Sequence, residues 1–142
     1  MSLFALSDTH LSLSTDKPMD IFGSRWQQHD KRIREAWENT VGDGDTVVVA
    51  GDISWAMSMD EALTDLAYLD RLPGRKLIGR GNHDYWWGTV YKMKKFFVEQ
   101  NGLSTISSEF STSMKYCINS FCSRNMCFRM YIYRNSSSII LY

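Results

Sequence analysis

The chain has 142 residues, and its 16 basic and 16 acidic side chains give a formal net charge of zero. This length suits one domain with a substantial core. The charge balance gives no electrostatic reason to expect a nucleic-acid or membrane surface as the main partner. No run approaches the ~20 apolar residues that span a bilayer, and the first residues lack the basic segment of a signal peptide. We therefore expect a cytoplasmic protein whose three cysteines are free thiols.

Short apolar runs alternate with stretches of helical period over the first 109 residues. Strands are expected over residues 3–7, 46–50 and 76–79, because each run is short, apolar and followed by a polar motif. Alternating strands and helices are typical of βαβ units with a parallel sheet. The predicted fold class is therefore α/β.

Three helices are expected between and after these strands. A helix over residues 24–40 is predicted by apolar residues spaced seven, four and four apart, namely Trp26, Ile33, Trp37 and Val41. A second helix begins at Ser58, the first residue of a capping-box pattern, and ends before Pro73. It directs Leu63, Leu66 and Ala67 inward. The third covers residues 89–100, with Val90, Met93 and Phe97 on one side, and stops before a left-handed Gly102.

The composition changes near Glu109. Residues 110–142 contain no acid, no glycine and no histidine, but four basic side chains. Three explanations are open: a divergent β-rich segment, a flexible extension, or residues read out of frame, which we favour. The alternation in residues 128–133 has β character and would pair with an exposed strand edge. We therefore divide the chain into an α/β segment, 1–109, and an atypical tail, 110–142.

Polar motifs follow the three expected strands directly: Asp8-Thr9-His10, Gly51-Asp52 and Gly81-Asn82-His83-Asp84. The carboxyl ends of parallel strands lie at one edge of a sheet, so we expect the motifs to converge in one crevice. They supply two carboxylates, two imidazoles and one carboxamide. This mixed oxygen and nitrogen set suits Mn²⁺, Fe or Zn²⁺.

The motifs, in this order, resemble the first three motifs of the calcineurin-like metallophosphoesterases, and the resemblance covers about residues 3–102. It implies the parallel-sheet half of a β-sandwich flanked by helices, and a hydrolase that acts on small phosphomonoesters or phosphodiesters. It also implies a role for each residue: Asp8 and His10 bind a first metal, Asp52 bridges two metals, Asn82 binds the second, His83 contacts the phosphoryl or leaving group, and Asp84 orients His83.

The chemistry implied by the resemblance is attack by a metal-bridging hydroxide. Water shared by two cations about 3.5–4 Å apart loses its proton near neutral pH and can attack phosphorus in line. The imidazole of His83, just outside the metal shell, can donate a proton to the departing alkoxide. The neutral overall charge does not favour a nucleic-acid substrate.

The sequence departs from the family in its histidines. Complete members supply further metal-binding histidines from two later motifs on a second sheet, whereas this sequence has only His10, His29 and His83. We therefore expect a chain truncated or frame-disrupted after about residue 109, with one metal retained and hydrolysis reduced. A catalytically inactive phosphate- or metal-binding remnant is the alternative, and completion of the site by a partner chain is a third.

Several conspicuous residues have an ordinary structural interpretation that we prefer. His29 is expected to be a structural or solvent-facing residue of its helix rather than a ligand. Residues 85–87, an aromatic run, are expected to pack the following helix onto the sheet rather than line a substrate site, and Trp55 has the same two interpretations. Arg80 is expected to be an exposed cation.

Overall fold

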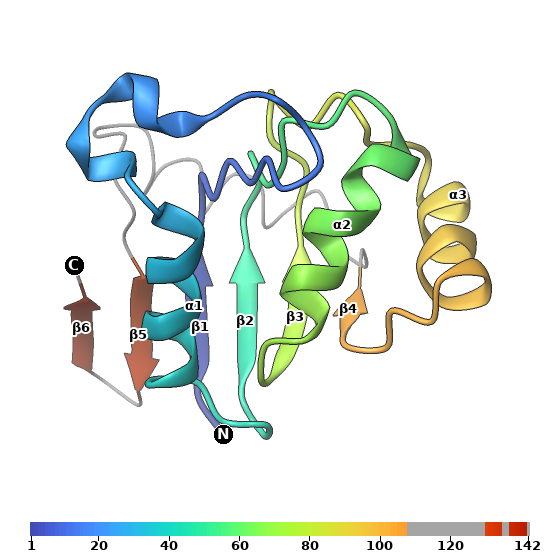
Figure 1. Cartoon of the computed structure of the whole chain (residues 1–142). Coiled ribbons are helices and arrows are strands. Elements are labelled where there is room, and N and C mark those ends of the chain that lie inside the picture. The colour runs from blue at the N-terminus through green and yellow to red at the C-terminus, as the bar shows by residue number, and fades with distance from the viewer. Residues whose placement is uncertain (108–129, 135–136, 142) are drawn as a thin grey trace.

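A computed structural model describes residues 1–107, 130–134 and 137–141. In these residues the strands form one six-stranded sheet in the order β4-β3-β2-β1-β5-β6 (Figure 1). The strands are β1 Leu3–Leu6, β2 Thr46–Val49, β3 Arg75–Ile78, β4 Ile106–Ser107, β5 Met130–Arg134 and β6 Ser137–Leu141. Strands β1 to β4 are parallel, and β5 and β6 extend the sheet antiparallel from β1. The predicted α/β fold with a parallel sheet is confirmed.

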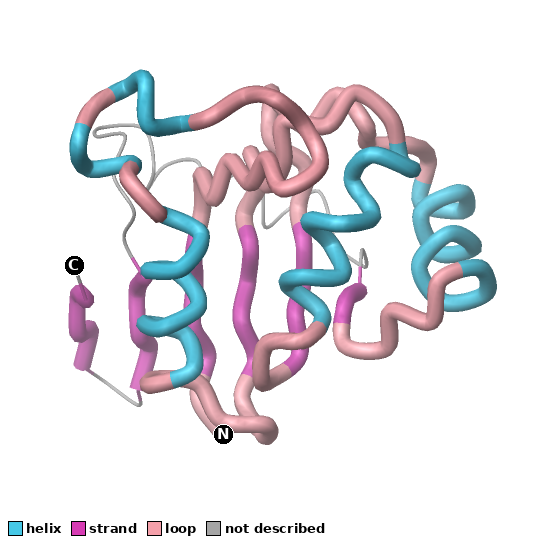
Figure 2. The backbone as a smooth tube through the Cα atoms, viewed as in Figure 1, coloured by secondary structure: helices cyan, strands magenta, loops and turns pink. Residues whose placement is uncertain are grey.

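The helices are η1 Met19–Phe22, η2 Ser24–Trp26, α1 His29–Glu38, α2 Met59–Asp70, α3 Val90–Lys94 and η3 Lys95–Gln100. Helices α1 and α2 lie across the same face of the sheet, and α3 lies beside the β4 edge (Figures 1 and 2). The connections from the strands to α1 and α2 all leave the sheet at one edge. This arrangement places the loops after β1, β2 and β3 together.

The helix expected over residues 24–40 is wrong in its first turns. Residues 24–26 form a separate 3₁₀ turn, and α1 begins at His29 after Gln28, whose φ of 49° is left-handed. A left-handed residue cannot continue a right-handed helix, so the chain changes direction there. The predicted apolar stripe nevertheless holds from Ile33 onwards, since Ile33, Trp37 and Val41 are all buried.

The core lies between α1, α2 and the sheet. It includes Ile33 and Trp37 of α1, Leu66 and Leu69 of α2, and Phe4, Leu6, Val47, Val49 and Ile78 of the strands. Full burial of such a side chain contributes about 1.5–3 kcal/mol. The indole of Trp37 also donates a hydrogen bond of 2.9 Å to the carbonyl oxygen of Pro73, which fixes α1 to the loop before β3. The core thus anchors the elements whose other ends carry the polar motifs.

The ends of α2 agree with the sequence. The Ser58 hydroxyl accepts a hydrogen bond from the Glu61 amide, as a capping residue does. Leu66 is fully buried and Leu63 and Ala67 pack against the core. The predicted helix and its inward face are therefore confirmed.

The third helix differs from the prediction on one side. Met93 and Phe97 are buried as expected, but Val90 is 61% exposed. The turn changes from α to π at Lys95, so the buried face shifts to Met93, Phe96 and Phe97. Gly102 has the left-handed φ of 63° predicted for it.

The β character predicted for the tail is confirmed where the structure describes it. Residues 130–134 form β5, which pairs with Leu3, Phe4 and Ala5 of β1. The proposed boundary at residue 109 stays a prediction, and the three cysteines and residues 108–129 lie outside the described residues.

A buried lysine occupies the amino end of β3. Lys76 is fully buried, and its ammonium donates to the carbonyl oxygens of Asp70 and Leu72 and to the Thr105 hydroxyl. Burial lowers the pKa of Lys76 to about 8, although the Asp70 and Asp43 carboxylates oppose this shift. An open cavity of about 690 Å³ lies beside this corner, at the end of the strand opposite the polar motifs.

Replacing this lysine should change how stability depends on pH. The folded chain releases the Lys76 proton near pH 8 and the unfolded chain near 10.5, so the free energy of unfolding of the native sequence should rise with pH between these values. In Lys76→Met this contribution is absent, so the native-minus-variant difference should increase across that window in urea titrations. An exposed control, Lys31→Met, should show no such trend. A pH-independent difference for Lys76→Met would contradict the assignment.

Candidate metal centre

The loops that follow β1 and β2 are held together by backbone hydrogen bonds. The Asp8 amide donates to the Gly51 carbonyl at 3.1 Å, and the His10 amide donates to the Asp52 carbonyl at 2.9 Å. A third bond, of 2.8 Å, runs from Leu11 to Ile53. The two loops thus continue the pairing of their parallel strands. The first two motifs therefore lie side by side.

Three residues of this pair of loops have left-handed backbones although they are not glycine. The φ angles are 57° at Asp8, 42° at His10 and 50° at Asp52. Each such conformation costs about 1–3 kcal/mol, and such residues cluster at functional sites. The strain is held in place by the inter-loop hydrogen bonds. Its concentration on three residues of the predicted site is physical support for a function there.

The third loop approaches so closely that glycine is required on both sides. Gly51 has a φ of 126°, and a Cβ atom added to it would lie 2.5 Å from the Gly81 amide nitrogen. A Cβ atom on Gly81 would overlap the Asp52 carboxylate. Any side chain at either position would force the second and third motifs apart.

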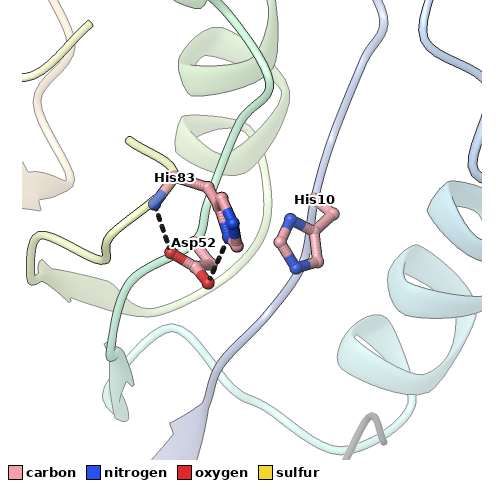
Figure 3. Close-up of side chains that lie close together, drawn as sticks. All are labelled: His10, Asp52 and His83. Carbon is pink, nitrogen blue, oxygen red and sulfur yellow. Dashed lines mark hydrogen bonds and ion pairs between the residues drawn. The ribbon is translucent and has the colours of Figure 1, made fainter. Parts of the chain in front are cut away.

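The contact between these loops places Asp52 against His83. One carboxylate oxygen of Asp52 accepts the His83 backbone N–H at 2.9 Å, and the other lies 3.0 Å from Nδ1 of the same residue. The His10 ring lies beside this pair (Figure 3). One ligand atom from each of His10, Asp52 and His83 lies within 4.8 Å of the others. We call these three residues the His-Asp-His cluster.

The cluster is closed on one side and open on the other. His10 and Asp52 are each only 8% exposed, whereas the side chain of His83 is 38% exposed. The Trp55 ring stacks on His10 with centroids 4.9 Å apart and lies 5.0 Å from the His83 ring. A small ligand can therefore reach the cluster from the His83 side.

The electrostatics of His10 suit metal binding. Burial lowers the pKa of His10, an effect opposed by the Asp52 and Asp8 carboxylates and reinforced by His83. The imidazole is therefore neutral at pH 7, the form that coordinates metals. Its Nδ1 atom is buried with no hydrogen-bond partner among the described residues. A buried nitrogen without a partner fits a position that a cation completes.

Asp8 and Asn82 lie at the rim of the cluster. Asp8 has one oxygen 3.9 Å from Nε2 of His10, and its other oxygen accepts the Ser7 hydroxyl at 2.5 Å. Asn82 is exposed, with its amide nitrogen 3.1 Å from both ring nitrogens of His83. Each of these two residues thus lies beside one histidine of the cluster. Their roles as ligands stay predictions.

Asp84 does not have the neighbours expected of it. It is fully buried, one oxygen accepts from the amides of Ile53 and Ser54 and the indole of Trp86, and the other accepts from the Gly81 amide at 2.7 Å. Asp84 therefore fastens the loops from the core side, and Asp52 is the carboxylate that contacts His83. Burial raises the pKa of Asp84, although its amide donors oppose this.

One supporting residue was not predicted from the sequence. Asp65 of α2 is fully buried and accepts from the Leu13 amide at 2.9 Å and the Ser54 hydroxyl at 2.5 Å. Burial raises its pKa, and these bonds oppose the rise. The sequence signal that could have identified Asp65 is the presence of an acidic residue on the otherwise apolar face of α2. His29, expected to be a structural or solvent-facing residue, is buried, and its Nε2 lies 3.3 Å from the carbonyl oxygen of His10.

The remaining aromatic and basic residues largely follow expectation. Trp86 is 3% exposed and belongs to the core, which confirms packing for that part of the aromatic run, whereas Tyr85 is 54% exposed beside His83. Arg80 is exposed. Trp55 packs on the His-Asp-His cluster itself.

Residues 1–133 match the sequence pattern of the calcineurin-like phosphoesterases, so the chain belongs to this family. The match extends past the composition change at residue 109.

The chain is also similar to the Gene 66 proteins of two mycobacteriophages. It is 38% identical to that of phage L5 over 58 residues and 41% identical to that of phage D29 over 56 residues. These segments cover 41% and 39% of this chain, and 28% of each relative's length.

A solved protein of unknown function from Aquifex aeolicus has a similar fold. Its TM-score is 0.50 at 19% identity, over 98% of this chain and 58% of the other. Among the residues the structure describes, no helix is both long and apolar enough to cross a membrane.

The close approach of the second and third loops can be tested by adding one methyl group at Gly51. Gly51→Ala should lower the free energy of unfolding by at least about 1–3 kcal/mol, because alanine is strained at a φ of 126° and its Cβ meets the Gly81 backbone. Gly44→Ala, which has open space and no positive φ, should change stability little. Equal effects in urea denaturation would show that the loops are not in this contact.

Proposed function

We propose that this chain is a metal-dependent phosphoesterase that hydrolyses small phosphomonoesters or phosphodiesters. Membership of the calcineurin-like phosphoesterases supports this chemistry at the level of the family. The observation that carries the proposal for this chain is the His-Asp-His cluster, which gathers one residue from each of the three strand-end motifs.

The residues present fit a divalent metal. His10 offers a neutral imidazole with an unpartnered buried nitrogen, and Asp52 offers a nearly buried carboxylate beside it. Asp8 lies 3.9 Å from the other ring nitrogen of His10, Nε2, and Asn82 lies on the His83 side. When bound, such metals activate water and neutralise phosphoryl charge. The mixed donors favour Mn²⁺, Fe or Zn²⁺, and we propose that one metal is held more firmly than a second.

We propose that His83 donates a proton to the leaving group. Its Nδ1 faces Asp52, so this carboxylate orients the ring, and the ring protonated on both nitrogens is the form that can give the Nε2 proton to the departing alkoxide. The half-exposed ring is open to a phosphoester that enters from solvent. Tyr85 and Trp55 flank the ring at centroid distances of 6.4 and 5.0 Å, so the leaving group would meet an aromatic surface.

The second candidate function is binding of a metal or a phosphate without turnover. It is favoured by the histidine count, since the sequence has three histidines and only two of them lie in the His-Asp-His cluster. Such a protein would bind Mn²⁺ saturably and would leave phosphoesters intact.

Hydrolysis of paired chromogenic mono- and diester phosphates with added Mn²⁺ separates these functions. We expect metal-dependent turnover that falls by about 100-fold or more in Asp52→Asn, because the variant loses a charge at the centre of the site. Asp16→Asn, which changes an exposed carboxylate, is the matched control and should retain full activity.

Turnover unaffected by Asp52→Asn would contradict the proposed site. Saturable Mn²⁺ binding by folded protein without hydrolysis of either ester would select the binding function instead.

A further inference from the structure

We propose that His29 is a positioning residue of the candidate metal centre, which holds the backbone of His10 so that its imidazole faces Asp52. This inference rests on the proposed function. His29 is 7% exposed and is the first residue of α1. It belongs to none of the three strand-end motifs.

Both ring nitrogens of His29 face backbone carbonyl oxygens. Nε2 lies 3.3 Å from the carbonyl oxygen of His10, and Nδ1 lies 3.2 Å from that of Trp26. Carbonyl oxygens only accept and a neutral imidazole carries one N–H, so the ring donates in one of these contacts at a time; the tautomer with its proton on Nε2 donates to the His10 carbonyl. The ring therefore links the loop after β1 to the turn that precedes α1.

The contact matters because His10 has a strained backbone. Its φ of 42° is left-handed, and its amide is already fixed by the 2.9 Å bond to the Asp52 carbonyl. His29 holds the other side of the residue, at the carbonyl. With both peptide groups held, the backbone that carries the His10 ring is fixed on both sides of the residue.

Aromatic packing reinforces the same geometry. The Trp26 ring meets His29 edge-on with centroids 5.5 Å apart and an interplanar angle of 78°. It also meets His10 at 5.9 Å and 64°. Trp26 thus contacts both imidazoles, while Trp55 stacks on His10 at an interplanar angle of 18°.

The break in the first helix explains how His29 reaches this position. Gln28 has a left-handed φ of 49°, so the chain turns between Trp26 and α1 instead of continuing a single helix from residue 24. The turn places the Trp26 carbonyl next to the ring of His29. The irregularity that the apolar periodicity does not predict is therefore the feature that directs His29 towards His10.

Two substitutions separate the two carbonyl contacts of the ring. The amide nitrogen of His29→Gln lies at the level of Nε2 and can still donate to the His10 carbonyl, whereas that of His29→Asn lies at the level of Nδ1 and is too short to reach it. Both variants are polar and similar in size, so both should fold. Ile33→Val, which trims a core residue one turn further along α1, controls for a general loss of packing.

The measurement is calorimetric binding of Mn²⁺ to each folded protein, with Co²⁺ absorption spectra as a report on the ligand geometry. We expect His29→Asn to weaken metal binding by about 10–100-fold, as loss of a residue that orients a metal ligand does, and to change the Co²⁺ spectrum. The metal affinity of His29→Gln and of Ile33→Val should stay within a few-fold of that of the native chain. Their Co²⁺ spectra should match the native spectrum.

Native affinity in His29→Asn, or equal weakening in the Asn and Gln variants, would overturn the positioning role while leaving the metal centre intact. Absence of any Mn²⁺ or Co²⁺ binding by the native chain would overturn the proposed function itself, and the role of His29 with it.

Discussion

The contact between the Gly51 and Gly81 backbones is the constraint that determines the geometry of the site. It brings the loops after β2 and β3 closer than any side chain at these positions would allow. Because of this approach, the Asp52 carboxylate accepts the His83 amide and lies against the His83 ring. The loop after β1 then completes the group through its hydrogen bonds to the backbones of Gly51 and Asp52.

Buried carboxylates hold these loops from the core side. Asp84 accepts hydrogen bonds from backbone amides of the second and third loops. Asp65, on α2, accepts hydrogen bonds from the first and second loops. Burying a carboxylate is costly unless hydrogen bonds compensate, and both residues accept several. Burial still raises the pKa of both carboxyl groups, so these bonds offset only part of the cost of burying them beneath the site. Such an arrangement gives the His-Asp-His cluster a fixed geometry before any ligand arrives.

Much of the fold can be predicted from the sequence because its signals are local. The strands before Asp8, Asp52 and Gly81 are short apolar runs, and parallel strands bring the loops at their carboxyl ends to one edge of the sheet. The helix that begins after Ser58 is defined by its own cap.

The predictions for the start of the first helix and for the partner of His83 were wrong for physical reasons that a pattern of apolar residues does not record. Periodicity records side-chain spacing, so it extended the first helix through Gln28, although the backbone of this residue is left-handed. Adjacency in sequence paired Asp84 with His83, but the turn directs Asp84 inward and the loop contact brings Asp52 to His83 instead. His29 is a buried structural residue as expected, but the sequence contains no signal for its contact with the His10 carbonyl.

Anomalous diffraction from crystals of the chain soaked in Mn²⁺ would test whether the three strand-end loops form one metal-binding group. We expect an anomalous peak in contact with both His10 and Asp52. A well-ordered structure with no peak there, or with Mn²⁺ bound only at the acidic side chains near the amino end of β3, would contradict the proposed metal centre.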